Sequence, residues 1–444
     1  MTNIAVIGMG QGGMTAAIKL AEAGYAVSVF EKEKQGNVSY PWKDDIRTEI
    51  FGLVGMPMPD ESIYCQKSKW LFVSPNEEHS LPVPPCPPME EVSISRRGLA
   101  DYFEKLATEA GCDMHFSTFV SSLVVKDDKV CGIVVNGKEQ FFDLVIDASG
   151  MNSPFRAQVP NKFGVQAKVL PTDVMYGYRA FFDKVDGATT REEGINSTLT
   201  LKHLGETGIS WCNLNEDGNV DVLIGRVGGL DDKQIESAIL ALRASNQILG
   251  THLISENKVE ICLRMSIARA VADGYVAIGD SAFMTMPLMG SGIESSMKAG
   301  VMFADYVTKN AVTDFAAKNT WGFYHDYMTQ YGADFAFVDV LKRWALALDP
   351  KVIDWVFGGG LIEKSDLALV TTDTSGNKPK IPAKSIAKKV FILLGHLPLV
   401  FKAVGCLARS LKAKNIAKKI PATYDEKKVA KWAKKYDRIL YKNN

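Results

Sequence analysis

The sequence predicts an α/β fold in three parts: a discontinuous domain of strands and helices, a β-rich domain inserted into it, and a helical, basic C-terminal region. Three observations underlie this prediction. Residues 3–31 follow the pattern of a strand, a glycine loop, a helix and another strand. A further strand runs into glycines near residue 280, and basic residues accumulate after residue 376. The 444 residues, 46% hydrophobic and 23% charged, are enough for two or three packed units of ordinary globular composition.

The first motif lies between two short apolar runs, NIAVI at 3–7 and AVSVF at 26–30, which are joined by an alanine-rich helical stretch. GMGQGG fits G-x-G-x-x-G, whose glycines permit a tight turn, close approach of a pyrophosphate and close helix packing. A carboxylate at the end of the second strand accepts hydrogen bonds from an adenosine ribose. A glycine-rich turn in some other α/β protein is the alternative. The pattern predicts a Rossmann-like domain whose cofactor-binding residues are Gly8, Gly10, Gly12, Gly13 and Glu31.

Residues 1–165 are expected to form the first part of this domain. From residue 40 to 91 the chain is rich in prolines, aromatics and short polar pieces, which interrupt helices, and we interpret this stretch as an excursion toward the substrate domain. A helix is expected over 96–110. The alternating segments that follow, SSLVV, VCGIVV and EQFFDLVIDASG, suit a small sheet that returns to the main one.

A β-rich substrate domain is expected over 166–265, and the second part of the nucleotide domain over 266–312. In the latter, a strand runs into a glycine loop before a helix from about residue 292 to 309. An aspartate at the strand end suits the ribityl hydroxyls of FAD, and the glycines let a helix N-terminus approach a phosphate or the flavin ring. This second motif favours FAD over NAD. Its predicted cofactor-binding residues are Gly279, Asp280, Pro287, Gly290 and Gly292.

These motifs, together with ISRRGLADYF and DLVIDASGMNSPFR, resemble the FAD-dependent oxidoreductases of the p-hydroxybenzoate hydroxylase type, most closely the geranylgeranyl reductase branch. The resemblance covers roughly residues 1–345 and implies that Arg96 approaches the flavin pyrophosphate. The hydroxylases usually have an Asp-Gly pair where this chain has Ser149-Gly150. The Ser-Gly form is more common in the reductases. Of the aromatic signature typical of the reductases, this chain retains only the tryptophan, Trp211. The tryptophan pair typical of flavin halogenases is missing from the sequence.

The resemblance implies an oxidoreductase that transfers hydride from reduced flavin to a carbon–carbon double bond of an apolar, isoprenoid or lipid-like substrate. An NAD(P)H-dependent flavin monooxygenase and a non-catalytic, membrane-associated flavin or electron-relay protein are the alternatives. The electron donor is left open between NAD(P)H, ferredoxin and a quinol. Trp211 is a candidate for the substrate cavity, although a strand tryptophan more often belongs to a core. The neighbouring Cys212 is interpreted as a buried, inert thiol.

The seven cysteines and six histidines show no metal-ligand spacing, so we expect no metal site. We also expect no nucleic-acid partner. The N-terminus runs straight into the first strand and glycine loop without the basic start of a secretion signal, so a cytoplasmic protein with reduced thiols is predicted.

A helical region is expected over 313–376 and a basic amphipathic tail over 377–444. The tail carries 18 Lys and Arg but three Asp and Glu, although the whole chain has 51 of each. From residue 390 to 411 apolar residues form one helical stripe at 390, 394, 397, 401, 404, 408 and 411. Because polar residues interrupt it, we expect this helix to lie on an anionic membrane surface, on the inner face, rather than to cross it. Packing on the acidic body and a solvated tail are the alternatives.

Overall fold

The main sheet of the computed structural model, which describes residues 2–83, 87–363 and 396–441, has the order β18-β19-β12-β1-β2-β8. All of its pairings are parallel except that of β18 with β19. Its strands are β1 (Asn3–Ile7), β2 (Ala26–Phe30), β8 (Asp113–His115), β12 (Leu144–Asp147), β18 (Val271–Ala272) and β19 (Tyr275–Ala277). Strands far apart in the chain thus lie side by side, as the discontinuous motifs predicted.

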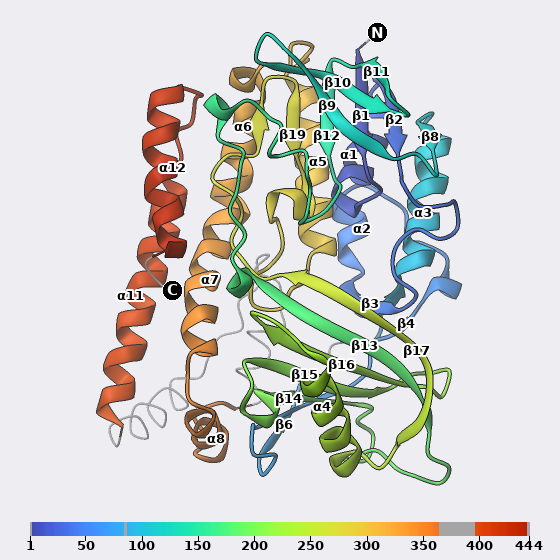
Figure 1. The fold of residues 1–444 in the computed structure, drawn as a ribbon, viewed down its shortest axis with the longest axis vertical. Coiled ribbons are helices and arrows are strands. Elements are labelled where there is room, and N and C mark those ends of the chain that lie inside the picture. The colour runs from blue at the N-terminus through green and yellow to red at the C-terminus, as the bar shows by residue number, and fades with distance from the viewer. Residues whose placement is uncertain (1, 84–86, 364–395, 442–444) are drawn as a thin grey trace.

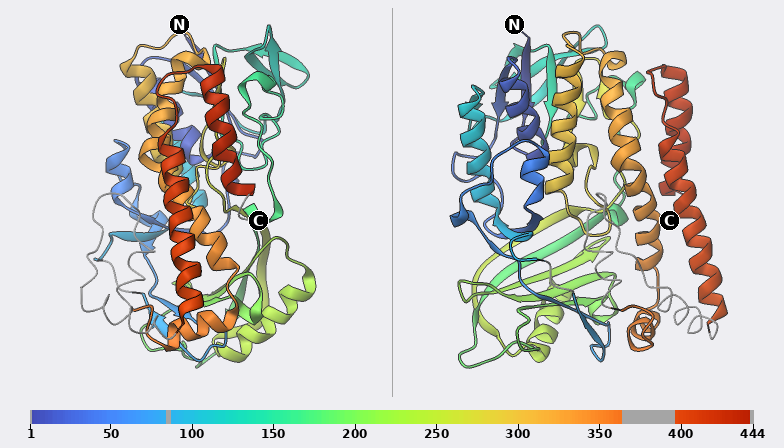
Figure 2. Two further views of the ribbon diagram at one scale, coloured as in Figure 1. Left: turned by 90° about the vertical axis from the view of Figure 1, so that its left-hand side faces the viewer. Right: turned by 180° about the vertical axis from the view of Figure 1, so that it is seen from behind.

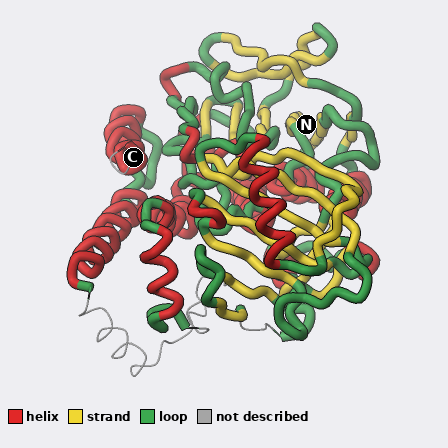
Figure 3. Tube along the Cα trace, turned by 60° about the horizontal axis from the view of Figure 1, so that its bottom comes forward, coloured by secondary structure: helices red, strands yellow, loops and turns green. Residues whose placement is uncertain are grey.

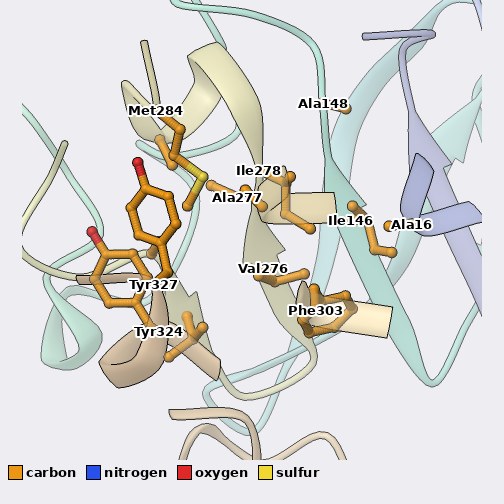
Figure 4. Close-up of a cluster of buried hydrophobic side chains, with 14 of the residues drawn as sticks. Ala16, Ile146, Ala148, Val276, Ala277, Ile278, Met284, Phe303, Tyr324 and Tyr327 are labelled. Atoms are coloured by element: carbon orange, nitrogen blue, oxygen red, sulfur yellow. The ribbon is translucent and has the colours of Figure 1, made fainter. Parts of the chain in front are cut away.

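Helices cover one face of this sheet and a small antiparallel sheet covers the other (Figure 1). The helices are α1 (Gln11–Glu22), α3 (Arg96–Glu109) and α5 (Ile293–Lys309), and the small sheet holds β9 (Val120–Lys126), β10 (Lys129–Val135) and β11 (Lys138–Phe141). Because both faces are covered, the central strands are continuously apolar rather than alternating. Figure 4 shows part of the resulting core, where Ile146, Val276 and Phe303 pack together.

The second large sheet has the order β17-β13-β16-β15-β14-β5-β6 and forms the lower layer in Figure 1. Its strands are β5 (Trp70–Val73), β6 (Ser80–Pro82), β13 (Val174–Lys184), β14 (Ser197–Leu201), β15 (Gly208–Leu214), β16 (Val220–Val227) and β17 (Leu249–Cys262). One helix within the stretch expected to be β-rich, α4 (Asp232–Ser245), begins at a capping box formed by Asp231 and Gln234 and packs on the outer face of the sheet (Figure 3). Helix α4 therefore covers one face of this sheet.

The proline-rich excursion connects the two large sheets. Its strands β5 and β6 join the second sheet, whereas β3 (Lys43–Arg47), β4 (Tyr64–Gln66) and β7 (Glu91–Ser95) form a separate three-stranded sheet beside α2 (Glu49–Leu53). This excursion places the segment before β3 between the nucleotide domain and the second sheet.

Helices dominate after residue 316: α6 (Ala317–Tyr327), α7 (Ala333–Leu346), α8 (Pro350–Gly358), α11 (Leu397–Lys418) and α12 (Glu426–Tyr441). Helix α11 packs along α7 through Cys406, Ser410 and Ala413. Helix α12 returns beside α11, as the left view of Figure 2 shows. Helix α11 of the tail therefore packs on the body through one face. In the described part of the chain no helix is long and apolar enough to cross a bilayer. Residues 390 and 394 of the predicted stripe lie outside the described residues.

Candidate functional site

A cavity of about 1280 Å³ lies between the carboxyl ends of the main sheet and the inner face of the second sheet. Ligand pockets usually measure about 300–1,000 Å³, so this one has room for a dinucleotide and a second molecule. Its walls come from the glycine loop after β1, the end of β2, the loop after β12, the loop after β19, the excursion and the second sheet. Open α/β sheets bind ligands at this edge.

The glycines of the first motif fit tightly against the loop after β12. Gly8 has a φ of +86°, and a Cβ atom at Gly8 or Gly10 would lie 2.8 Å from the Ala148 carbonyl oxygen. Gly8, Gly10 and Gly12 line the cavity. Gly13 does not line it, because its Cα faces the Ala148 methyl group, which a Cβ would meet at 2.3 Å. Gly13 thus serves the close packing of α1, and the other three leave a wall of bare backbone.

Helix α1 directs its N-terminus at the cavity. Its N-cap, Gly10, makes no side-chain cap and the first turn contains no acidic residue, so backbone N–H groups and the positive end of the helix dipole are available for an anion. Glu31 is buried at the end of β2 and lines the cavity. One of its oxygens accepts from the Met9 N–H at 2.9 Å and the other from the Glu33 N–H at 2.8 Å. These two bonds fix the carboxylate at the cavity edge.

The second motif lies beside the first. A Cβ at Gly12 would meet the Ile278 side chain at 2.8 Å, just before the turn at Gly279, whose φ is +74°. Asp280 lines the cavity, and one of its carboxylate oxygens accepts from the Thr285 hydroxyl. Gly290 and Gly292 line the cavity as well, and Gly292 is the N-cap of α5. Pro287 is buried but is not part of the cavity wall.

Arg96 also reaches the cavity, from the first position of α3. Its guanidinium contacts the Ser39 hydroxyl at 3.4 Å, lies 3.7 Å from a carboxylate oxygen of Asp44 and stands over the Tyr40 ring. The Tyr40 ring stacks on Trp42 at a centroid distance of 4.4 Å. The structure therefore places Arg96 next to the Tyr40–Trp42 aromatic pair, which the sequence-based prediction did not include.

Ser149 and Gly150 line the cavity next to the glycine cradle. The Ser149 hydroxyl donates to Asp147 at 2.6 Å, and the same carboxylate accepts from Tyr275 at 2.6 Å and from Ser153 at 2.5 Å. Burial is the largest cause that raises the pKa of Tyr275 well above its usual value, followed by the charge of Asp147. This buried network fixes the loop against which the first glycines pack.

The other end of the cavity is walled by side chains of the second sheet and the excursion. Trp211 lines it, contacts Trp70 edge to face at 5.6 Å, and has a buried indole N–H without a hydrogen-bond partner among the described residues. The apolar residues that share this wall are Phe72, Met175, Phe181, Leu199, Ile209, Leu223 and Val259. This end of the cavity suits an apolar ligand.

Arg179 holds the excursion against the second sheet. Its guanidinium donates to Asp221 at 3.1 and 2.7 Å, to Asp44 at 2.9 Å and to the Lys43 carbonyl at 3.0 Å. It also lies over the rings of Trp42 and Trp211, at 4.8 and 5.3 Å from their centroids. Arg179 was not predicted as a site residue, because its partners come from three segments with no fixed spacing in the sequence.

Polar groups also line the cavity beyond the aromatic wall. The Lys43 ammonium lies 3.1 Å from the Cys65 sulfur and 3.4 Å from a carboxylate oxygen of Glu216. Removal from bulk water raises the pKa of Cys65 and of Asp45, although Lys67 lies 3.6 Å from the Asp45 carboxylate. The cavity thus contains a carboxyl group that keeps a proton to higher pH than an exposed aspartate does.

Cys212, beside Trp211, is buried in the core beneath α4, and burial raises its pKa to about 12. This agrees with its interpretation as an inert thiol. Cys86 lies outside the described residues. Within the described ranges no three histidine, cysteine or acidic side chains are grouped so that they could hold a metal ion.

The residues of the nucleotide end fit FAD. The bare glycine backbone and the N-terminus of α1 suit a pyrophosphate, Glu31 suits a ribose, and Asp280 lies on the adjacent loop where a ribityl chain would extend. Bound FAD would supply hydride-transfer chemistry at this site.

Comparisons with known proteins agree with this geometry. Residues 3–41 match the family model described as FAD binding domain. The digeranylgeranylglycerophospholipid reductase of Sulfolobus acidocaldarius is 21% identical over 463 aligned positions, which cover 100% of this chain and 98% of that protein. The corresponding protein of Haloferax volcanii is 24% identical over 341 positions, covering 71% of this chain and 78% of that protein. The predicted FAD-binding domain and the resemblance to this group of reductases are confirmed.

Solved structures share the fold. A geranylgeranyl bacteriochlorophyll reductase-like protein from Thermoplasma acidophilum superimposes with a TM-score of 0.72 at 16% identity, covering 92% of this chain and 100% of that one. The flavin-dependent brominase Bmp2 gives a TM-score of 0.62 at 17% identity, covering 90% of this chain and 100% of that one. At these identities the likeness concerns the fold alone, and it confirms the predicted α/β architecture.

Proposed function

We propose that this protein is a FAD-dependent oxidoreductase that reduces carbon–carbon double bonds of an apolar, isoprenoid or lipid-like substrate. The observation that carries the proposal is the single cavity in which a glycine-walled nucleotide end opens directly onto a wall of aromatic and aliphatic side chains. Reduced flavin delivers a hydride to an alkene carbon, and a proton completes the reduction. The names of the sequence relatives support the same substrate class.

The chain's own residues position the substrate and exclude water. Trp211 and Trp70 present ring faces and edges to a hydrocarbon chain, and the aliphatic residues that share the wall with them keep it dry. Asp45, whose pKa is raised by its removal from bulk water, is a candidate proton donor inside the same cavity. The segment with Tyr40 and Trp42 stands between the two ends and limits the approach of solvent to both.

The electron donor in this proposal is NAD(P)H or ferredoxin. The donor binds transiently, because the sequence has a single G-x-G-x-x-G motif and so no second one for a separate nicotinamide domain. The protein is cytoplasmic and attached to the inner face of a membrane, where a lipid-like substrate is concentrated. The basic C-terminal helices support this placement, because a positive surface is attracted to anionic headgroups.

The test is anaerobic reoxidation. The holoprotein is reduced with dithionite and mixed with detergent-dispersed digeranylgeranylglycerophospholipid, and the visible spectrum of the flavin is followed. We expect the oxidised spectrum to return and the lipid to gain two mass units for each double bond reduced. Failure of every polyprenyl substrate to reoxidise the flavin would refute the proposal. Oxygen consumption coupled to NAD(P)H oxidation and stimulated by an aromatic compound would assign the protein to the monooxygenases instead.

Neighbouring residues on strand β15 provide a matched pair of variants. Trp211→Leu changes the cavity wall and should slow reoxidation by the lipid about tenfold, while the flavin spectrum before reduction stays the same. Cys212→Ala lies on the opposite face of the strand and should leave the rate unchanged. Equal reoxidation rates for the two variants would show that the aromatic wall is not part of the substrate site.

A further inference from the structure

Helix α11 has a buried face and an exposed apolar face that are opposite each other. The buried face carries small side chains, Cys406, Ser410, Ala413 and Ala417, and lies against α7. The exposed face carries the outward stripe, which consists of Leu397, Phe401, Val404, Leu407 and Leu411, each between 48% and 73% exposed. An ordinary surface helix has the reverse arrangement, with large apolar residues inward and polar residues outward.

The outward stripe is bordered by positive charge. Helix α11 contains Lys402, Arg409, Lys412, Lys414 and Lys418 and no acidic residue. At 100° per residue, Arg409 and Lys412 lie on one side of the stripe and Lys414 on the other, while Lys418 follows Leu411 in line with the stripe. Lys414 also pairs with Asp334 of α7, which holds the helix in this orientation. A large apolar face with basic borders is typical of helices that lie in the interface of an anionic bilayer.

The N-terminal end of the stripe lies at the same end of the molecule as the apolar part of the cavity. The ring of His396, which precedes α11, lies 4.0 Å from that of Trp355 on α8. Helix α8 in turn contacts the turn between β5 and β6, where the Asn76 N–H donates to Asp354 at 2.9 Å and His79 packs against Gly358. Strand β5 supplies Trp70 and Phe72 to the cavity wall. Figures 1 and 2 show α8 beside the lower end of α11 in each view.

We propose that the outward stripe docks α11 on the surface of an anionic lipid bilayer, with its phenylalanine, valine and leucine side chains among the acyl chains and its lysines at the headgroups. A second copy of this chain fits the stripe less well. In a twofold contact, the basic residues that border the stripe would face their own copies without an acidic partner on the helix. A bilayer with anionic headgroups removes this repulsion.

Docking through the outward stripe rests on the surface alone, and its role in supplying a lipid substrate rests on the proposed function. Vesicle co-sedimentation tests the docking. The full-length holoprotein is mixed with vesicles of equal parts phosphatidylcholine and phosphatidylglycerol, or of phosphatidylcholine alone, at low and high salt. We expect binding to the mixed vesicles that weakens at high salt and is weaker on phosphatidylcholine alone.

Phe401→Glu is expected to lower the partition coefficient about tenfold or more, because one of the most exposed side chains of the stripe no longer enters the acyl region. Arg409→Glu is expected to lower binding to the mixed vesicles about fivefold or more and to have little effect on phosphatidylcholine. The matched control is Leu240→Glu, which introduces the same charge at an exposed leucine on α4. Its binding should equal that of the unmodified protein.

The docking proposal is overturned by absence of binding to anionic vesicles, or by equal binding of the Phe401→Glu and Leu240→Glu proteins. It is also overturned if light scattering shows a dimer that Phe401→Glu dissociates, because the stripe would then face a second copy. Reoxidation by detergent-dispersed lipid should be unchanged in Phe401→Glu. A protein that binds vesicles but reduces no alkene would leave the docking intact and refute only the proposed function.

Discussion

The two ends of the cavity are built from different parts of the amino acids. At the nucleotide end the wall is mainly backbone, where Gly8, Gly10 and Gly12 approach neighbouring loops so closely that a Cβ would collide with a carbonyl oxygen or a side chain. At the substrate end the wall is made of large side chains, held by the guanidinium of Arg179 between two carboxylates and two indole rings. The nucleotide end offers backbone groups to a phosphate. The substrate end offers a shaped surface of side chains to a hydrocarbon.

This difference separates what each end tolerates. A backbone cradle depends on a few positions that must be glycine, so its contacts do not change when surrounding side chains are replaced. A wall of side chains changes shape with every substitution, and its stability depends on the charges that hold it. Substitutions at the substrate end should therefore change protein stability and substrate choice while flavin binding persists.

The largest expected effect is that of Arg179→Met. Asp221 is 2% exposed, so removal of its cation leaves a buried carboxylate unpaired and should lower the free energy of unfolding by about 3–5 kcal/mol. The measurement is the chemical denaturation midpoint, together with the visible spectrum of the holoprotein, which should still show bound flavin. Arg243→Met is the matched control, since Arg243 lies over the Phe182 ring and donates to the Gly250 carbonyl, with no carboxylate partner among the described residues. Its cost should be about 1 kcal/mol. Loss of flavin from the Arg179 variant would contradict the independence of the two ends.

The same difference explains how much of the molecule could be predicted from its sequence. The G-x-G-x-x-G loop, Glu31 and the loop around Asp280 have fixed spacings relative to their strands, and the structure brings them to one cavity as expected. Trp42, Arg179 and Asp221 were not identified, because they come from the excursion and from two strands whose order in the sheet differs from their order in the chain. Helix α4 also went unpredicted within a stretch otherwise composed of strands.

The C-terminal tail shows the limit of a pattern without its tertiary context. The part of the predicted apolar stripe from 397 to 411, which includes Phe401 and Val404, forms one face of a helix as expected, but periodicity alone left open whether this face would be buried. The structure buries the opposite, small-residue face around Ser410 instead. Small side chains give a weak sequence signal, although they let two helices pack closely.

A smaller effect concerns pH and the sheet that carries the substrate end. His203 is 1% exposed, its Nδ1 lies 3.0 Å from the Ser210 hydroxyl, and burial lowers its pKa from 6.5 to about 4, although Glu77 opposes this shift and Arg226 adds to it. Below pH 6.5 the unfolded chain takes up a proton that the native protein excludes, so stability falls as the pH falls toward 4. Between pH 7.5 and pH 5 this residue should cost about 2 kcal/mol of the free energy of unfolding.

Denaturation curves at the two pH values check this expectation. His203→Gln should remove that part of the pH dependence. His252→Gln, at an exposed position of β17, should retain the behaviour of the unmodified protein. If His203→Gln keeps the full pH dependence, the titrating group that destabilises this sheet lies elsewhere.

The smallest expected effect is on flavin affinity, and it distinguishes the two halves of the nucleotide end. Because FMN lacks the adenosine half of FAD, a residue that binds the adenosine ribose should discriminate between the two flavins. Glu31→Gln keeps the size of the side chain but loses the charge that strengthens its bond to a hydroxyl, and should weaken FAD about tenfold and FMN not at all. Asp280→Asn, at the expected site of the ribityl chain, should weaken both flavins by a similar factor. Fluorescence titration of the apoprotein measures all four affinities.

Glu33→Gln is the control for loss of charge at the same edge of the cavity, since Glu33 also lines it and follows the same strand. Its affinities for FAD and FMN should match those of the unmodified protein. Equal weakening of FMN and FAD by Glu31→Gln would mean that this carboxylate acts on the whole nucleotide end, as it would if its bonds to the Met9 and Glu33 N–H groups shape the loop rather than present an acceptor to the ligand. Selective weakening of FAD would show that the two loops divide the cofactor between them, so that each half of the nucleotide end has its own determinant.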